Sequence, residues 1–166
     1  MKAIVYTSNT GFTKEYAEML ENKLSLPVYE LDKAKKELKK GTEIIYMGWL
    51  FASSVKGYKT AERRFNIKAV CGVGLADTGS LLNEVRKAIS LPDNIPLFTI
   101  QGGIRLSKLR GINKSMIKML TRVFVNKKNP TDDDKRMIEL LTTEASYVNE
   151  DNLSAFLNWY ESNKQN

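Results

Sequence analysis

The chain has 166 residues, of which 42% are hydrophobic and 27% charged, and this composition predicts a globular protein rather than a disordered or fibrous one. It contains no histidine and one cysteine, Cys71, which excludes a Ser-His-Asp triad, a Cys-His pair and a zinc site of histidine and cysteine ligands. The formal net charge is +7. Any chemistry here must therefore use a cofactor, carboxylates, hydroxyls or backbone groups.

Short apolar runs alternate with segments of helical spacing along the first hundred residues. The apolar runs predict strands at 2–7, 27–31, 43–50, 67–75 and 95–100. Helical spacing predicts helices at 13–26, after Asp32, at 58–66, at 78–90 and, near the end of the chain, at 152–164. Such alternation requires right-handed crossovers between parallel strands, so we expect an open, doubly wound α/β domain with helices on both faces of a parallel sheet. Ligands of such domains bind at the carboxyl ends of the strands.

The regular alternation stops after Gly103, and residues of about 104–150 are predicted to form an insertion before the last helix, within a single domain spanning 1–166. Eight basic residues and no acidic ones lie between Arg105 and Lys128, leaving 18 basic and 19 acidic residues elsewhere. The excess positive charge therefore belongs to one segment, and it predicts a local contact with an anionic partner.

Helical spacing within the insertion predicts a basic amphipathic helix. Its basic side chains recur every four residues and form a stripe along one side: Arg110, Lys114, Lys118 and Arg122. The opposing apolar face is predicted to comprise Leu109, Ile112, Met116, Leu120 and Val123. This helix could lie on an anionic bilayer, bind the acid groups of a substrate, dock on an acidic redox partner, or pack on the domain with a solvated basic face.

The loop after the first predicted strand combines hydroxyl side chains with one glycine, just before a helix. It comprises Ser8, Asn9, Thr10, Gly11, Phe12 and Thr13. Hydroxyls, a helix N-terminus and a glycine that permits close approach are the components of a phosphate site. The loop is neither a Walker A motif nor the dinucleotide Gly-x-Gly-x-x-Gly fingerprint. The simpler alternative is an ordinary turn in which Thr10 or Thr13 caps the helix.

The same run resembles the flavodoxin signature, in residue types at Ile4, Val5, Tyr6, Ser8, Gly11, Thr13 and Ala17. The resemblance implies a flavodoxin-like sandwich with a five-stranded parallel sheet of order 2-1-3-4-5 and FMN as cofactor. It also implies that Ser8, Asn9, Thr10, Gly11, Phe12 and Thr13 wrap the phosphate of FMN.

In flavodoxins the isoalloxazine ring lies between the loops after strands three and four. By resemblance the first of these loops supplies Trp49, Leu50, Phe51, Ala52 and Ser53. The second supplies Gly74, Leu75, Ala76, Asp77, Thr78 and Gly79. Trp49 or Phe51 would stack on one ring face, although Trp49 could instead be the last core residue of its strand. The second loop lacks the aromatic residue usual in flavodoxins, and typical flavodoxins are acidic where this chain has a basic segment.

The sequence from Gly102 to Leu106, followed by a basic, methionine-rich helix and an aspartate-rich turn at 131–134, resembles the insertion of the menaquinone-dependent protoporphyrinogen oxidases. In that family FMN takes electrons from protoporphyrinogen and passes them to a membrane quinone. The resemblance implies that the basic residues border the flavin or contact the substrate. These residues are Arg105, Arg110, Lys114, Lys118 and Arg122.

Other candidate sites have simpler explanations. Cys71 lies mid-strand among apolar residues and is predicted to be a buried core residue rather than a nucleophile. The run 132–134 lacks the spacing of a calcium loop and is interpreted as an acidic cluster just ahead of a helix at 135–141. The basic stripe matches no DNA-binding motif, so nucleic acid is not an expected partner. We assign no metal site and no catalytic side chain.

Together these patterns predict an FMN-binding, flavodoxin-like protein that transfers electrons through the flavin to a redox protein or a small molecule. The alternative is an FMN-dependent protoporphyrinogen oxidase that passes electrons to a quinone. A third possibility is an FMN-binding assembly or regulatory module without turnover. The lone cysteine and the lack of a leader-like segment favour a cytoplasmic protein, with any membrane contact peripheral and at the inner face.

Overall fold

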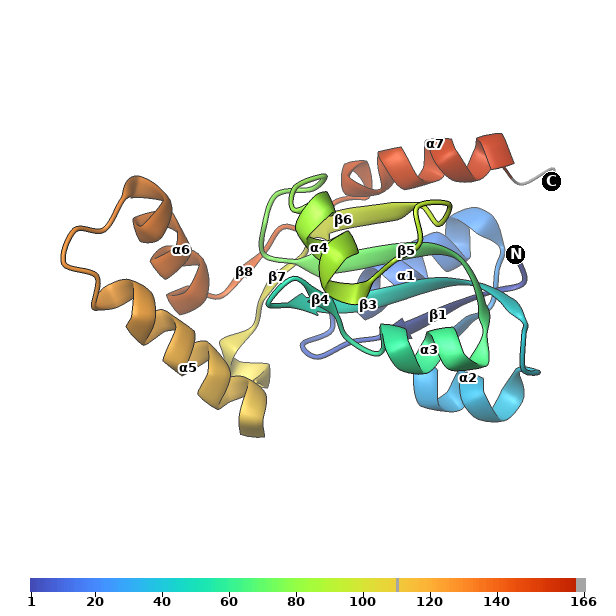
Figure 1. Ribbon diagram of the computed structural model, residues 1–166, viewed down its shortest axis with the longest axis horizontal. Helices are drawn as coiled ribbons and strands as arrows, with labels where there is room; N and C mark the ends of the chain where they lie inside the picture. The colour runs from blue at the N-terminus through green and yellow to red at the C-terminus, as the bar shows by residue number, and fades with distance from the viewer. Residues whose placement is uncertain (110, 164–166) are drawn as a thin grey trace. The chain divides into compact units, whose positions relative to one another are not determined.

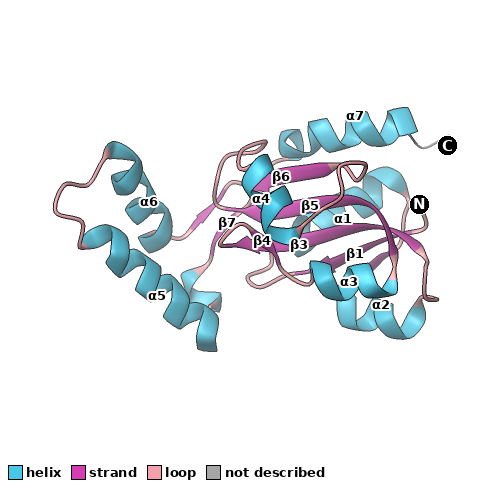
Figure 2. Cartoon of the chain, in the orientation of Figure 1, coloured by secondary structure: helices cyan, strands magenta, loops and turns pink. Residues whose placement is uncertain are grey.

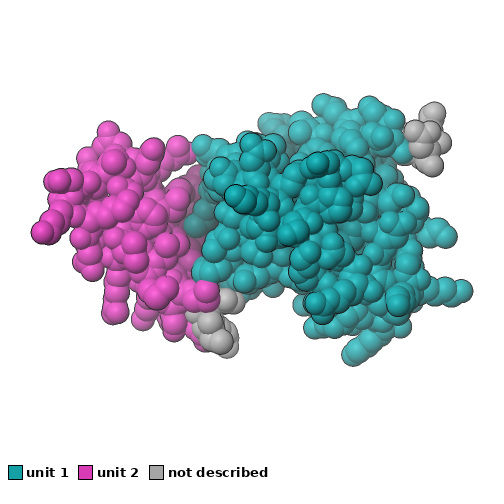
Figure 3. All heavy atoms as spheres, in the orientation of Figure 1, with its two compact units in different colours: residues 1–102, 148–166 teal, residues 103–147 magenta. Residues whose placement is uncertain are grey.

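The computed structural model describes residues 1–109 and 111–163. The chain divides into two compact units (Figure 3): unit 1 comprises 1–102 and 148–166, and unit 2 comprises 103–147. Each unit is described by itself below. The single domain over 1–166 stays a prediction.

Strands and helices alternate along unit 1 (Figures 1 and 2). The strands are β1 (Ala3–Thr7), β2 (Val28–Glu30), β3 (Glu43–Phe51), β4 (Ser54–Val55), β5 (Asn66–Gly74) and β6 (Leu97–Gln101). The helices are α1 (Phe12–Leu24), α2 (Leu31–Glu37), α3 (Tyr58–Arg64), α4 (Leu82–Ile89) and α7 (Ser154–Asn163), the last preceded by the 3₁₀ turn η2 (Glu150–Leu153). Each predicted strand and helix of this unit is therefore present, with ends displaced by a few residues.

The sheet confirms the predicted α/β class and differs in detail. Five strands are parallel in the order β2-β1-β3-β5-β6. A sixth strand, β4, pairs antiparallel with the end of β3, which the prediction of five strands did not include. Because β4 takes a number, the predicted fourth and fifth strands carry the labels β5 and β6.

Both faces of the sheet are buried, as continuous apolar strands require. Successive strand residues point to opposite faces, so Ile4 and Val5 lie in different hydrophobic clusters, and both are fully buried. One cluster joins the sheet to Tyr16 of α1 and Phe156 of α7. The other joins it to residues of α2, α3 and α4. Cys71 is fully buried in the first cluster, and burial raises the pKa of its thiol, which confirms its prediction as a core residue.

Unit 2 begins and ends in a short antiparallel pair of strands, β7 (Gly103–Ile104) and β8 (Ala145–Ser146). Between them lie the 3₁₀ turn η1 (Leu106–Lys108) and the helices α5 (Gly111–Val125) and α6 (Asp132–Thr142). The aspartate run lies at the N-terminus of α6, as predicted, but it forms the first turn of this helix, which begins three residues earlier than expected. None of the helices in the described part of the chain has the length and hydrophobicity needed to cross a membrane.

Candidate functional site

The predicted binding loops of unit 1 begin at one edge of the sheet. Thr7 at the end of β1 is in register with Gly48 of β3, and Gly74 at the end of β5 is in register with Gln101 at the end of β6. β2 lies on one side of β1 and β3 lies on the other, so the order of the strands reverses at β1. The carboxyl ends of β1 and β3 therefore form the topological switch point of the sheet. Ligands of open α/β sheets bind in the crevice at such a point.

The segment between β1 and α1 is a tight turn into the helix. The backbone N–H of Gly11 donates to the Ser8 hydroxyl at 3.1 Å. Gly11 has φ of 108° and is the N-cap residue of α1, and no side chain caps this helix. The alternative in which Thr10 or Thr13 caps α1 is therefore wrong. A helix N-terminus without a side-chain cap, entered through a glycine, fits an anion such as a phosphate.

Burial separates the predicted residues of this loop. Phe12 and Thr13 are 4% and 1% exposed, and Phe12 packs in the core cluster between the sheet and α1. Ser8, Asn9 and Thr10 are half-exposed. Ser8 and Thr10 are thus partly accessible, whereas Phe12 could contribute to a ligand only through its backbone.

The predicted loop at 49–57 is a β-hairpin. β3 continues to Phe51, and the chain reverses at Ala52 and Ser53, which have φ of 47° and 59°. Positive φ at both central residues is typical of the two-residue turns that connect the strands of β-hairpins. Phe51 pairs with Ser54 on the returning strand.

Two aromatic side chains lie on one side of this hairpin. The rings of Trp49 and Phe51 meet edge to face, with centroids 6.1 Å apart, and both are half-buried. The Lys56 ammonium lies 5.8 Å from the Trp49 centroid and 5.3 Å from that of Phe51. Trp49 belongs to neither core cluster, so the alternative that it is a core residue is not supported. Leu50 points the other way and packs against the core of the α2–α4 face.

The segment after β5 is held by the end of β6. The Gln101 side-chain amide donates to the Leu75 carbonyl oxygen and to a carboxylate oxygen of Asp77, both at 3.2 Å. The Gln101 backbone N–H donates to the Thr78 hydroxyl at 3.0 Å. The N–H of Gly79 donates to the Thr99 carbonyl at 3.0 Å. These bonds explain why α4 begins at Leu82 rather than at 78 as predicted.

A second set of bonds joins this segment to α1 and the approach to α7. The Tyr16 hydroxyl donates to the Gln101 carbonyl at 2.6 Å and accepts from the Asn152 side-chain amide at 2.8 Å. The Thr78 hydroxyl donates to the Asn152 side-chain oxygen at 2.8 Å. Sequence patterns did not single out Gln101 or Asn152, and they marked Tyr16 only as a position on the apolar side of a helix. The only local signal was a polar residue at the end of an apolar strand, which is common.

The basic stripe is partly confirmed, and its predicted apolar counterpart is wrong at Leu109. Lys114, Lys118 and Arg122 are exposed on α5, while Arg105 is half-buried before η1. Arg110 lies outside the described residues, as does the side chain of Ile112. Leu109 precedes α5 and lines a pocket together with the three basic side chains, not a face opposite to them. Val123, predicted on the apolar face, is 56% exposed, whereas Met116 and Leu120 are half-buried.

The aspartates of α6 have a structural role. Thr131 and Asp134 form a capping box, and Lys127 donates to an Asp134 carboxylate oxygen at 2.6 Å. The Lys127 hydrogen bond, then that from the Thr131 backbone, lowers the pKa of Asp134. Among the described residues no group of three side chains could hold a metal ion.

No protein-family model matches this chain, no curated protein matches its sequence, and no solved structure matches its fold. Unit 1 itself is an α/β fold with a mostly parallel sheet, and this architecture is compatible with the flavodoxin-like fold that the sequence resembles.

Proposed function

We propose that unit 1 is a flavodoxin-like domain that binds FMN and transfers electrons through it. The observation that carries the proposal is the uncapped N-terminus of α1, entered through Gly11 at the switch point of the sheet. The first-turn N–H groups and the hydroxyls of Ser8 and Thr10 would hold the phosphate. Bound FMN would supply the redox chemistry, and the protein would set its orientation and exposure.

The β3–β4 hairpin and the segment after β5 support a place for the isoalloxazine ring of FMN. The Trp49–Phe51 pair offers an aromatic surface on the β3–β4 hairpin, and the Lys56 ammonium adds positive charge beside it. The backbone at 75–79 offers polar groups and is held by Gln101, so it needs little rearrangement to receive a ligand. Preorganisation of this kind reduces the entropy lost on binding.

The alternative is an FMN-dependent protoporphyrinogen oxidase that passes electrons to a quinone. The cationic side chains on α5 favour it, since a substrate with acid groups would need them. Under the first proposal these cations would instead dock an acidic redox protein. Either protein would work in the cytoplasm, the oxidase at the inner membrane face.

Titration of the protein with FMN and with riboflavin tests the cofactor assignment. Riboflavin lacks the phosphate, so FMN should bind far more tightly. Thr10→Ala should weaken FMN binding by about tenfold or more, because a hydrogen bond to a charged group is worth ~1.5–3 kcal/mol, and should leave riboflavin binding unchanged. Thr60→Ala, at an exposed position of α3, is the matched control. Equal affinity for the two flavins, or an equal effect of Thr10→Ala on both, contradicts the assignment.

Anaerobic mixing of the FMN-loaded protein with protoporphyrinogen distinguishes the two functions. Flavin bleaching with the appearance of porphyrin fluorescence, reversed by an added quinone, identifies the oxidase. A flavin spectrum that does not change identifies an electron carrier or an enzyme for another substrate.

A further inference from the structure

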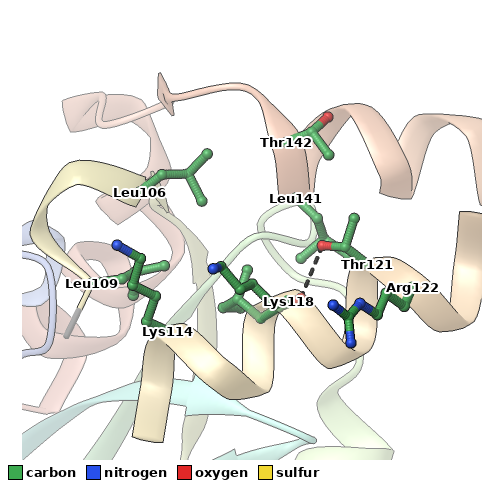
Figure 4. A pocket seen from close by; sticks show the side chains of 9 residues that line it. Leu106, Leu109, Lys114, Lys118, Thr121, Arg122, Leu141 and Thr142 are labelled. Atoms are coloured by element: carbon green, nitrogen blue, oxygen red, sulfur yellow. Dashed lines mark hydrogen bonds between the residues drawn. The ribbon is translucent and has the colours of Figure 1, made fainter. Parts of the chain in front are cut away.

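Unit 2 contains a pocket of its own, between η1, α5 and α6. Its volume is about 420 Å³, within the ~300–1,000 Å³ typical of small-molecule sites. The lining residues are Leu106, Leu109, Lys114, Ile117, Lys118, Thr121, Arg122, Leu141 and Thr142. Figure 4 shows Lys114, Lys118 and Arg122 following one another along α5, with Leu141 and Thr142 contributed by α6.

Among the residues that the structure describes, three cations line this pocket and no carboxylate does. Lys114, Lys118 and Arg122 are spaced by four residues, which corresponds to ~6 Å of helix per step. Within the described part of the chain none of the three forms an ion pair, whereas Lys127 on the same segment is paired with Asp134. The positive charge of the pocket is therefore not neutralised by these residues of unit 2, and it favours an anionic ligand.

The rest of the lining is apolar or already hydrogen-bonded. Leu109 and Leu141 are 6% and 2% exposed and form an apolar wall with Leu106 and Ile117. The Thr121 hydroxyl donates to the Ile117 carbonyl at 2.9 Å. The Thr142 hydroxyl donates to a carbonyl of α6 at 2.7 Å. Since both hydroxyl protons are used within the helices, recognition of an anion falls to the cations.

We propose that this pocket binds an amphipathic organic anion, with its apolar body on the leucine and isoleucine wall and its acidic groups paired with Lys114, Lys118 and Arg122. A fully polar anion would leave the apolar wall in contact with water, and a neutral apolar molecule would leave the cations unpaired. The inference concerns unit 2 alone and does not depend on flavin binding.

Anilinonaphthalene sulfonate and phenylnaphthylamine are suitable probes, because they share the same rings and differ in the sulfonate. The full chain should bind the anionic dye with a salt-sensitive rise in fluorescence. Replacing Lys114, Lys118 and Arg122 together by Gln should weaken anionic dye binding by about tenfold, through loss of charge pairing, and leave the neutral dye unaffected.

Matched variants separate the pocket from general effects. Lys36→Gln, Lys40→Gln and Lys87→Gln together remove the same charge from exposed positions of unit 1 and should leave dye affinity unchanged. Met119→Gln with Val123→Gln changes exposed apolar residues of α5 outside the lining and should also have no effect. Leu106→Trp narrows the pocket and should weaken both dyes. Equal losses in the two charge triples, or none in the pocket triple, overturn the proposal.

Competition identifies the source of the anion. Displacement of the dye by dodecanoate below its micelle concentration indicates a free organic acid. Displacement only by phosphatidylglycerol vesicles indicates a membrane lipid with the same chemistry. Failure of both to displace the dye contradicts an amphipathic anion as the occupant.

Discussion

The Tyr46 hydroxyl donates a hydrogen bond of 2.7 Å to the carbonyl oxygen of Lys56. The Thr7 hydroxyl at the end of β1 donates to the same oxygen, also at 2.7 Å. One carbonyl thus joins β1 and β3 to the residue just before Gly57 and α3. Because this junction lies at the switch point, it holds the β3–β4 hairpin beside the proposed phosphate loop.

Tyr46→Phe should make the free energy of unfolding less dependent on pH in the alkaline range. Burial raises the pKa of Tyr46 above its ordinary value of 10.0. The folded state therefore holds the phenolic proton more tightly than the unfolded chain does. This contribution is complete below about pH 10 and is lost as the pH rises further toward the folded pKa.

Urea unfolding between neutral and alkaline pH measures the effect. At neutral pH the variant should lose about 1 kcal/mol, the usual net value of one hydrogen bond. Above about pH 10 the wild type should lose free energy of unfolding more steeply than the variant does. Burial also raises the pKa values of Tyr58 and Cys71, so the free energy of unfolding should still fall with pH in both proteins because of these two residues. Identical slopes would contradict the role given to Tyr46.

Gly57→Ala should destabilise the fold far more than Gly41→Ala. Both glycines have positive φ, of 81° and 80°. A Cβ at Gly57 would collide with the Tyr46 hydroxyl and lie 2.7 Å from Cγ2 of Thr7, whereas one at Gly41 would meet nothing within 4 Å. The backbone penalty of about 1 kcal/mol is common to both, so the excess at Gly57, expected to exceed ~2 kcal/mol, measures the collision. Thermal unfolding of the two variants tests this prediction. Equal losses of stability would show that Tyr46 and Thr7 move aside to accommodate the added Cβ.

Ala52→Asn with Ser53→Gly should stabilise the hairpin. Both residues have positive φ, which Asn and Gly adopt at lower cost than Ala and Ser. The double variant should gain roughly 1–2 kcal/mol in the free energy of unfolding. Chemical denaturation measures the gain. A loss would mean that the wild-type side chains make contacts worth more than the backbone cost.

Thr131→Ala should weaken α6. It removes the side chain that accepts from the Asp134 N–H, and loss of such a cap costs about 1 kcal/mol. Thr131→Ser, which keeps the acceptor, should retain most of the stability. The pKa of Asp134 is lowered, so its contribution is present above about pH 4 and is lost as the pH falls through the folded pKa. Far-UV circular dichroism during acid titration should show that helix loss begins at a higher pH in the Ala variant than in the wild type.

Local patterns were sufficient for most of unit 1. A strand buried on both faces must be apolar throughout, as at 43–50, and a helix covering a sheet must be apolar at its own period, as at Tyr16 and Leu20. Both signals are contained in a few consecutive residues. The same holds for the hydroxyl- and glycine-rich turn before α1 and for the acidic first turn of α6.

The sequence by itself thus determined the class of sheet and the approximate positions of its strands and helices, apart from β4. Only the tertiary structure decided that Ala52 and Ser53 form a hairpin turn, since neither is a usual turn residue there and one of the bonds to Lys56 comes from Thr7 on the distant strand β1. Tertiary structure alone also joined Gln101 to Tyr16 and Asn152, and placed Leu109 in a pocket with the cations of α5. Such contacts connect residues far apart in the chain, and periodicity, which reports only a residue's near neighbours, carries no information about them.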